Sequence, residues 1–318
     1  MGDDKIVKNV DIMSTLKKPT ILNISIGMII YIFKSQVWKW KIDVPEKIGK
    51  YKLAREVKKE NPYMYYGIGV YKYNKKDFFI KTWTGRLKDY RYYDLVNEYI
   101  LNKLLHRMLV DRKIYIPEII ACKKTNSSLS IVYEFVKGKS LTNYPVGNQA
   151  EIISKILNAY IDISSSLTKK EATKFPKRDM FYYIFFFPFI VILTIASNIK
   201  SARIILKSYT DFLISIKKVS FKKLHIAHRD MCLDNIIVKG SKIYLLDYGR
   251  TVLTLPGYDI TFINIRLKKS LSKLITNEFK NMSDKFLTNY ILIHLSMSFG
   301  RPKGHRNIYL QTLYEKYT

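Results

Sequence analysis

The sequence predicts an α+β fold with two lobes, a small β-rich N-lobe and a larger, mostly helical C-lobe. Two observations carry this prediction: strand-like runs dominate residues 63–136, and apolar residues recur at helical spacing in the second half of the chain. A length of 318 residues is enough for a sizeable packed core. We expect residues 1–45 to form an apolar and basic extension, residues 46–137 the N-lobe and residues 138–318 the C-lobe.

The predicted N-lobe consists of strands with one helix inserted. Four runs rich in aromatic and β-branched residues predict strands at 63–73, 78–83, 117–123 and 129–136. A polar turn at 74–77 separates the first two. The inserted helix is indicated by apolar side chains at three- and four-residue steps, namely Tyr92, Leu95, Val96 and Tyr99. We therefore expect one small sheet with a helix beside it.

The predicted C-lobe is mostly helical, because two amphipathic stripes recur at helical spacing. The first stripe comprises Ile152, Ile153, Ile156, Leu157 and Tyr160. The second stripe comprises Ile205, Tyr209, Phe212, Leu213 and Ile216. Each helix is expected to turn one apolar face toward a core. No internal repeat or low-complexity linker interrupts the chain.

Between these two helices, residues 180–199 form an apolar segment with no charged side chain from 181 to 196. A helix of this length could cross the hydrocarbon core of a bilayer, but Pro188 in its middle would kink or break it. Three interpretations remain open: a transmembrane helix, an interfacial or re-entrant element, and a buried helix of the C-lobe. A single crossing would put pieces of one lobe on opposite faces of a membrane, so we rank spanning last.

Residues 21–33 form a shorter apolar run inside the N-terminal extension. Lysines flank this run, and Trp38, Lys39, Trp40 and Lys41 follow it. Interleaved aromatic and basic side chains are typical of a membrane interface, and the same run equally fits a helix packed on the main domain. It is short for a bilayer span, and no small-residue cleavage site follows it, so we expect no secretory signal peptide.

The chain carries a formal net charge of +29, from 55 Lys and Arg against 26 Asp and Glu. A field of this sign favours anionic partners, which include nucleic acid, nucleotide phosphates and an anionic membrane face. An AT-rich genome would explain part of the excess. No known nucleic-acid reader motif is present, so we expect no specific nucleic-acid partner. Cys122 and Cys232 show neither a disulfide framework nor metal-ligand spacing, as suits a reducing, cytoplasmic setting.

Two short polar motifs in the second half of the chain point to a chemistry. The first, from His228 to Asn235, reads H-R-D-x-x-x-x-N. The second, from Asp247 to Gly249, reads D-x-G and ends an apolar, strand-like run. This order and spacing are those of kinase-type phosphoryl transfer.

Each motif residue offers a group that phosphoryl transfer needs. Asp230 can orient an acceptor hydroxyl or accept its proton. Asn235 and Asp247 offer hard oxygen atoms, which suit Mg²⁺. The apolar runs 236–238 and 243–246 predict a hairpin that would bring Asn235 and Asp247 to the same end of two adjacent strands.

With these motifs the chain resembles the protein-kinase-like superfamily over about residues 60–260. It is more similar to lipopolysaccharide-core sugar kinases and aminoglycoside phosphotransferase-type small-molecule kinases than to typical protein kinases. The resemblance implies a two-lobed protein-kinase-like fold with ATP between the lobes. It also implies that Asp230 is the catalytic aspartate and that Asn235 and Asp247 bind Mg²⁺.

The resemblance extends to charged residues on either side of the motifs. Lys81 matches the strand lysine that contacts the α- and β-phosphates of ATP. Glu98, on the predicted helix, matches the ion-pair partner of that lysine. Asp259 matches a buried aspartate that braces the catalytic loop, and we expect His228 to hold this loop rather than to move protons.

Two further segments resemble nucleotide-binding parts of the family. The residues from Glu134 to Val136 resemble the hinge that contacts adenine through its backbone. Gly67 and Gly69 resemble a reduced glycine loop over the phosphates.

The departures from the family pattern guide the predicted function. The chain has Asp-Tyr-Gly instead of Asp-Phe-Gly, lacks Ala-Pro-Glu, and has too few residues between 249 and 259 for a regulated activation loop. The resemblance therefore implies a kinase that uses ATP and Mg²⁺ to phosphorylate a hydroxyl of a sugar or lipid-linked glycan. We expect it in the cytoplasm, peripheral at the inner face of the plasma membrane.

Several alternatives remain open at the level of the sequence. The first is a soluble small-molecule kinase of the aminoglycoside or choline type, and the next is an atypical protein kinase. A membrane-associated pseudokinase, which binds without catalysis, is the alternative outside the enzymes. The sequence predicts neither the oligomeric state nor the identity of the acceptor.

Overall fold

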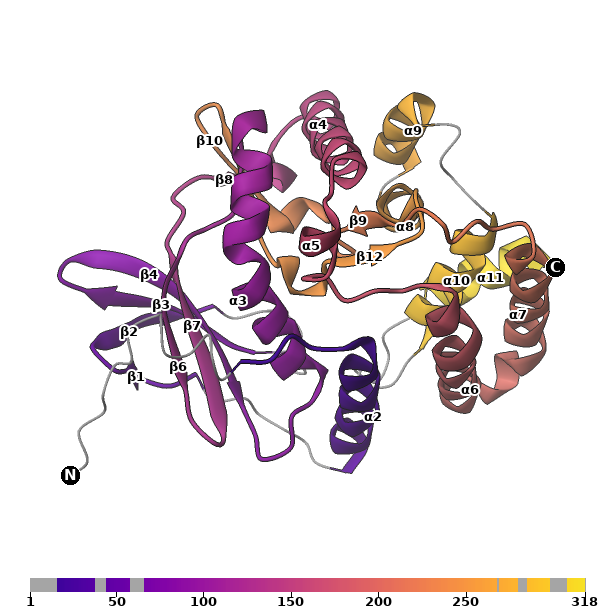
Figure 1. Ribbon diagram of the computed structural model, residues 1–318, viewed down its shortest axis with the longest axis horizontal. Helices are drawn as coiled ribbons and strands as arrows, with labels where there is room; N and C mark the ends of the chain where they lie inside the picture. Colours follow the sequence, from indigo (N-terminus) through magenta and orange to yellow (C-terminus); the bar gives the residue numbers. More distant parts are fainter. Residues whose placement is uncertain are drawn as a thin grey trace. The chain divides into compact units, whose positions relative to one another are not determined.

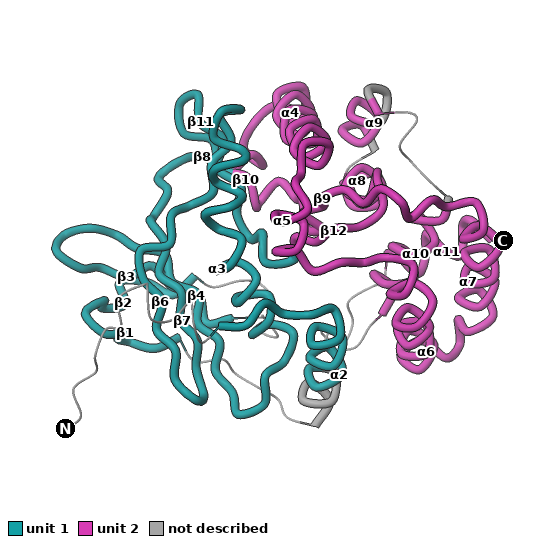
Figure 2. Tube along the Cα trace, viewed as in Figure 1, with its two compact units in different colours: residues 1–139, 237–250 teal, residues 140–236, 251–318 magenta. Residues whose placement is uncertain are grey.

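The computed structural model describes residues 16–37, 44–57, 66–267, 269–279, 285–297 and 308–317. The chain divides into two compact units, residues 1–139 with 237–250 and residues 140–236 with 251–318 (Figure 2). The start of the first predicted strand, 63–65, and the Trp-Lys repeat at 38–41 lie outside the described residues.

Unit 1 is built on a six-stranded antiparallel sheet with the order β1-β2-β3-β4-β7-β6 (Figure 1). Its strands are β1 (Lys47–Ile48), β2 (Tyr51–Glu56), β3 (Gly67–Tyr73), β4 (Lys76–Thr84), β6 (Ile119–Lys124) and β7 (Ser128–Glu134). The four predicted strands correspond to β3, β4, β6 and β7. Asn74 and Lys75 connect β3 to β4 with φ angles of 49° and 61°. Two such residues in a row are typical of the tight turn that matches the twist of a hairpin.

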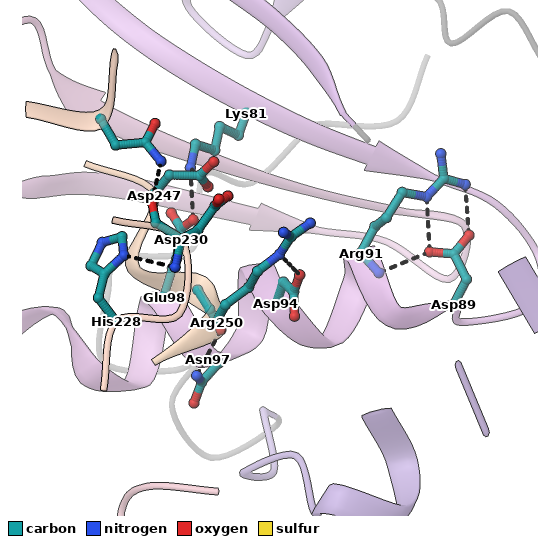
Figure 3. A network of polar contacts seen from close by, with 12 residues as sticks. Lys81, Asp89, Arg91, Asp94, Asn97, Glu98, His228, Asp230, Asp247 and Arg250 are labelled. Atoms are coloured by element: carbon teal, nitrogen blue, oxygen red, sulfur yellow. Dashed lines mark hydrogen bonds and ion pairs between the residues drawn. The ribbon is translucent and has the colours of Figure 1, made fainter. Parts of the chain in front are cut away.

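Helix α3 (Tyr90–Leu109) packs on this sheet through the face that the sequence predicts. Its four predicted core side chains are buried in one cluster with Leu129 and Ile131 of β7. The helix begins at Asp89, whose carboxylate accepts hydrogen bonds from the backbone N–H and the guanidinium of Arg91 (Figure 3). Since Asp89 and Arg91 are both buried, this N-cap and ion pair fix the first turn of α3.

The apolar run of the N-terminal extension forms helix α2 (Ile21–Val37), which packs against the start of α3. At Gly27 a Cβ atom would lie 2.7 Å from the backbone N of Tyr90, so only glycine allows the two helices this close. The Tyr31 and Tyr90 rings meet edge to face with centroids 4.9 Å apart, and the Arg91 guanidinium lies over Tyr31. The structure thus shows a helix packed on the main domain.

The predicted hairpin near the second motif is present. It consists of β10 (Ile236–Lys239) and β11 (Lys242–Leu245), which are neighbours in a four-stranded sheet with the order β5-β11-β10-β8. The other strands of this sheet are β5 (Ile114–Tyr115) and β8 (Lys139–Ser140). Gly240, at φ +59°, forms the tight turn of the hairpin. Because β11 pairs in parallel with β5, residues 237–250 group with unit 1, whereas the predicted C-lobe included them.

Unit 2 is mostly helical, with a two-stranded sheet of β9 (His225–Ala227) and β12 (Val252–Thr254). Its helices are α4 (Val146–Ser165), α5 (Lys169–Ala172), α6 (Phe187–Ser197), α7 (Ala202–Ile216), α8 (Tyr258–Arg266), α9 (Lys269–Glu278), α10 (Lys285–Ser296) and α11 (Ile308–Tyr317). The predicted stripe on α4 is largely buried. On α7, Ile205 and Phe212 are buried as expected, but Leu213 is 43% exposed because it lies beside rather than on the packed face.

The apolar segment 180–199 forms a π-helical turn, η3 (Tyr182–Phe186), followed directly by α6. Pro188 lies in the first turn of α6, directly after the π-helical turn, and not in the interior of a regular α-helix. Instead of the predicted break, the helix changes from π to α at Phe187, one residue before Pro188. Among the described helices, none is long and apolar enough by itself to span a bilayer. The pair 182–197 and 199–216 meets these criteria together, with a bend of 115°.

The close packing at Gly27 leads to a test of the contact between α2 and α3. Gly27→Ala should lower the free energy of unfolding by about 1–3 kcal/mol, because the added methyl group meets backbone atoms that cannot move aside. Gly147→Ala is the matched control, since Gly147 is also helical but has open space around it. The control should be stabilised by about 0.5–1 kcal/mol. Thermal unfolding of both variants measures the difference, and equal effects would contradict the close contact.

Candidate active site

The first part of the candidate site is an ion pair inside unit 1. Lys81 lies on β4, next to Ile131 of β7, and Glu98 lies on α3. The Lys81 ammonium is 2.6 Å from Glu98 Oε1, and both side chains are almost completely buried. The Tyr133 hydroxyl donates a hydrogen bond to the other carboxylate oxygen, Glu98 Oε2. The predicted pair between strand and helix is therefore formed.

Asp247 supplies a second carboxylate to the same lysine. Its Oδ1 atom lies 2.9 Å from Lys81 Nζ, and about a third of its side chain is exposed (Figure 3). Asp247 has a φ of 54°, in the left-handed region that aspartate and asparagine tolerate better than most residues. This backbone turn follows β11 after a single residue. Lys81 thus joins the strand, the helix and the second motif.

The ionisation of this cluster follows from burial and charge. Burial by itself would lower the pKa of Lys81, but the adjacent Asp247 and Glu98 carboxylates more than offset it and leave the pKa raised. The lysine is therefore a permanent cation at neutral pH. Burial raises the pKa of Glu98, while Lys81 and the hydrogen bond from Tyr133 pull it down.

Tyr248 and Gly249, the two residues after Asp247, are hydrogen-bonded to α3. The Asn97 amide donates to Gly249 O at 2.7 Å, and the Asn102 amide donates to the Tyr248 hydroxyl at 2.5 Å. At Gly249 a Cβ atom would lie 2.6 Å from Asp94 O, so this short 3₁₀ turn, Tyr248–Arg250, lies too close to the helix for any other residue. The bond to Asn102 also accounts for tyrosine in place of the usual phenylalanine, because a phenyl ring could not accept it.

The second part of the candidate site is a loop in unit 2 that follows β9. The Asp259 carboxylate, at the start of α8, accepts hydrogen bonds from the backbone N–H groups of His228 and Arg229 at 2.7 and 2.8 Å. Burial raises the pKa of Asp259, whereas His228 and these hydrogen bonds lower it. Gly257, at φ 81°, lets the chain turn into α8. Asp259 therefore has the bracing position that the resemblance implied.

His228 is fully buried, and its Nδ1 accepts a hydrogen bond from Asp230 N at 3.3 Å. This contact fits the structural role predicted for the ring. Arg229 has a φ of 68°, an unfavourable conformation for a long side chain, and its guanidinium lies over the Tyr258 ring. Such local strain persists only where the surrounding bonds impose it, and here the bonds to Asp259 do so.

Asp230 and Asn235 are held together within this loop. Asn235 lies at the end of the short helix η5 (Leu233–Asn235), and its amide nitrogen donates to Asp230 O at 2.9 Å. The amide oxygen of Asn235 is not used by that bond. The Asp230 carboxylate itself is 3.0 Å from the guanidinium of Arg266, at the end of α8.

Sequence reasoning missed Arg266. It lies 36 residues after Asp230, outside both motifs, and nothing in its neighbourhood distinguishes it from the many other cations of this chain. Only the packing of α8 brings the two side chains together. The bracing position of Asp259 on the same helix is the one signal that could have pointed to it.

The predicted nucleotide-binding segments have simple local structures. Gly67 and Gly69 lie within β3 rather than in a loop, opposite Thr82 and Ile80 of β4. At Gly69 a Cβ atom would collide with the Leu53 side chain, so this glycine serves the packing of the sheet. The connection before β3, residues 58–65, lies outside the described residues.

The hinge segment begins at the end of β7. The backbone N–H of Glu134 donates to Glu118 O at 2.9 Å, and its carboxylate accepts from Glu118 N at 3.1 Å. Both the backbone N–H and the carboxylate of Glu134 are therefore hydrogen-bonded to Glu118. Val136 lies two residues beyond the strand and is partly exposed.

Solved structures of phosphotransferases share this architecture. No protein-family model matches the sequence, and no curated protein matches it. The apo form of a thermostable aminoglycoside phosphotransferase APH(4)-Ia superposes with a TM-score of 0.62 at 10% identity, covering 85% of this chain and 97% of that chain. The ternary complex of this enzyme with AMP-PNP and hygromycin B gives 0.61 at 11% identity, with 85% and 95% covered. A microcompartment-associated aminopropanol kinase gives 0.57 at 10% identity, with 90% and 93% covered.

The protein has the protein-kinase-like fold. The predicted fold class, an α+β fold with a small β-rich N-lobe and a larger helical C-lobe, is confirmed, and the sheet of the N-lobe is antiparallel. Within this fold, unit 1 brings together Lys81, Glu98 and Asp247, and unit 2 brings together Asp230 and Asn235. The roles of all five in catalysis or in nucleotide and metal binding remain predictions.

The environment of Cys232, two residues after Asp230, gives a test of the loop. Burial and the nearby Asp230 charge raise the pKa of the Cys232 thiol to about 12, and burial does the same for Cys122. At pH 8 both thiols should be protonated and should react with iodoacetamide about a hundredfold more slowly than in the unfolded chain. Mass spectrometry of native and urea-unfolded protein measures the rates. Fast labelling of Cys232 in the native protein would contradict the packed loop.

Proposed function

We propose that this protein is a kinase that transfers the γ-phosphoryl group of ATP to a hydroxyl group. The single observation that carries the proposal is Lys81, held jointly by Glu98 and Asp247 in the N-lobe fold of known phosphotransferases. A buried lysine with two carboxylate partners is costly to build for stability alone. In kinases this arrangement positions the nucleotide phosphates relative to the aspartate that binds the metal.

Lys81 would bind the α- and β-phosphates of ATP through its permanent positive charge. Glu98 orients the ammonium group, and Tyr133 in turn orients Glu98. Because the Glu134 amide is bonded within the sheet, an adenine contact by backbone donor groups would fall to Val136. The ATP analogue in the APH(4)-Ia complex supports this choice of nucleotide.

Each of the two proposed ligands, taken within its own unit, carries an oxygen atom of the kind that magnesium prefers. Asp247 offers a partly exposed carboxylate, and Asn235 offers the amide oxygen that its bond to Asp230 leaves unused. Within the described ranges, no group of three His, Cys, Asp or Glu side chains could hold a metal by itself. Kinase magnesium needs no such group, because one or two protein oxygens act together with the phosphates. When bound, the ion would neutralise the charge that develops on the transferred group.

Asp230 would orient the acceptor hydroxyl and accept its proton. The loop that carries it is fixed by Asp259 through two backbone hydrogen bonds and by the buried His228 ring. The Arg266 guanidinium contacts Oδ1 of the Asp230 carboxylate at 3.0 Å. We propose that Arg266 positions Asp230 for this purpose.

The acceptor that we propose is a sugar or a lipid-linked glycan at the cytoplasmic face of a membrane. The positive charge of the chain and the apolar segment of unit 2 support this choice. A soluble small-molecule acceptor is the second candidate, favoured by the fold of the aminoglycoside and aminopropanol kinases. The short stretch from Gly249 to Asp259 speaks against a regulated protein kinase.

The proposal is tested by ATP turnover. Asp230→Ala should lower the magnesium-dependent rate of phosphoryl transfer by about 10²–10⁴-fold, because the acceptor loses its general base. Asp234→Ala is the matched control, since Asp234 is an exposed carboxylate of the same loop and should change the rate little. Radiolabelled γ-phosphate transfer to mixed glycan and small-alcohol acceptors gives the measurement. Full activity of Asp230→Ala would refute the assignment, and ATP binding without any turnover in the wild type would identify a pseudokinase.

The proposed role of Arg266 has a separate test. Arg266→Ala should lower kcat by about 10–100-fold while KM for ATP stays unchanged, because Asp230 loses a charged hydrogen-bond donor but the nucleotide contacts remain. Arg266→Lys keeps the charge and should restore part of the rate. A loss that appears in KM for ATP, with no rescue by lysine, would mean that Arg266 does not act through Asp230.

A further inference from the structure

The segment η3–α6 in unit 2 exposes a row of large apolar side chains. Its outward face, defined by the following five residues, is 44–60% exposed at each of them: Phe181, Ile184, Phe185, Phe189 and Ile192. Steps of three and four residues put them along one side of the segment. The Phe181 and Phe185 rings contact each other with centroids 4.5 Å apart. Single exposed apolar side chains are common, but a continuous row of this kind marks an interaction surface.

The opposite side of the same segment is firmly packed in the unit. Tyr183 and Phe187 contact Tyr290 of α10, with ring centroids 5.1 and 4.7 Å apart. The Tyr183 hydroxyl is 2.8 Å from Thr254 Oγ1, and the Thr194 hydroxyl donates to Ile293 O at 3.3 Å. Because these buried contacts fix the rotation of the helix, the outward face cannot turn inward.

A helix that is apolar on all sides is normally enclosed on all sides. Here the described residues enclose one side of the helix and leave the outward face exposed, so this face requires a partner. The segment 182–197 contains 16 residues, or about 24 Å of helix, which is shorter than the roughly 30 Å hydrocarbon core of a bilayer. Its packing against α10 and the 115° bend into the next helix also exclude a straight span. The geometry therefore fits a helix that lies along a surface.

The charges at the two ends of the outward face indicate the chemistry of that surface. Lys177 and Asp179 precede the segment, Lys200 and Arg203 follow it, and the three cations are exposed. From residue 180 to residue 210 there is no Asp or Glu. Apolar side chains flanked by cations are the pattern of elements that insert into the interface of anionic lipids. A second copy of the chain would bring like charges together, in a protein whose net charge is +29.

We infer that the outward face of η3–α6 docks on a bilayer of anionic phospholipid, with the phenylalanines inserted among the acyl chains and the flanking cations at the headgroups. The surface belongs to the same unit as Asp230. One further step rests on the proposed function: this docking would give the kinase access to an acceptor carried by a lipid. Membrane binding itself requires no catalysis.

The experiment is sedimentation with vesicles of equal parts phosphatidylglycerol and phosphatidylcholine, compared with phosphatidylcholine alone. The wild type should bind the mixed vesicles, and raising the salt concentration should weaken binding by screening the cations. The combined variant Phe185→Ser, Phe189→Ser and Ile192→Ser should bind about a hundredfold more weakly, since three inserted side chains are lost. Lys200→Glu with Arg203→Glu should remove the preference for the anionic lipid.

A control variant removes three equally exposed apolar side chains elsewhere, by Leu87→Ser, Leu274→Ser and Ile308→Ser, and should bind like the wild type. Circular dichroism confirms that each variant is folded. Equal loss in both triple variants, or no vesicle binding by the wild type, would overturn the inference. A dimer of the wild type in gel filtration would also overturn the inference, if the Phe185, Phe189 and Ile192 changes dissociate it and the control changes do not. ATP turnover measured without vesicles reports on the kinase separately, so either proposal can fail alone.

Discussion

The buried ammonium group of Lys81 is the constraint on which the arrangement of unit 1 depends. An isolated charge at this depth would cost several kcal/mol, so the fold must bring carboxylates to it. Glu98 comes from a helix and Asp247 from the end of a distant hairpin, 166 residues away along the chain. One cation therefore forces three separate pieces of chain to converge. The same requirement explains why burial and charge act on the pKa of Lys81 in opposite directions, with the carboxylates prevailing.

Helix α3 connects the Lys81 cluster to the other parts of unit 1. Its first turn is fixed by the buried pair of Asp89 and Arg91, against which α2 packs through Gly27 and Tyr31. Its middle carries Glu98, and its polar side chains Asn97 and Asn102 hold the residues that follow Asp247. In unit 2, α8 has a comparable role. Asp259 at its beginning braces the loop of Asp230, and Arg266 at its end reaches the carboxylate itself.

Much of the fold and of the candidate site could be predicted from the sequence, because local periodicity and the short spacings between motif residues indicate it. The strands around Lys81, the helix that carries Glu98 and the hairpin before Asp247 all follow from patterns within about ten residues. Arg266 could not be found this way, because its meeting with Asp230 depends on how α8 packs. Gly67 and Gly69 resemble a glycine loop in the sequence and lie inside a paired strand in the structure, and their contact with phosphates stays a prediction. At Pro188 the sequence predicts a break, whereas the structure has a π-helical turn just before it, and such turns are too rare to be predicted from one sequence.

The hydrogen bonds that attach Tyr248 and Gly249 to α3 have a consequence for regulation. In protein kinases with long activation loops, movement of the loop and of the equivalent helix decides whether the site is assembled. Here the segment is short, its glycine lies against the helix backbone, and its tyrosine and carbonyl groups are bonded to asparagines of that helix. Asp247 and Glu98 must therefore move as one body. For the proposed kinase this removes the usual off state, so its output would follow the supply of acceptor rather than a conformational switch.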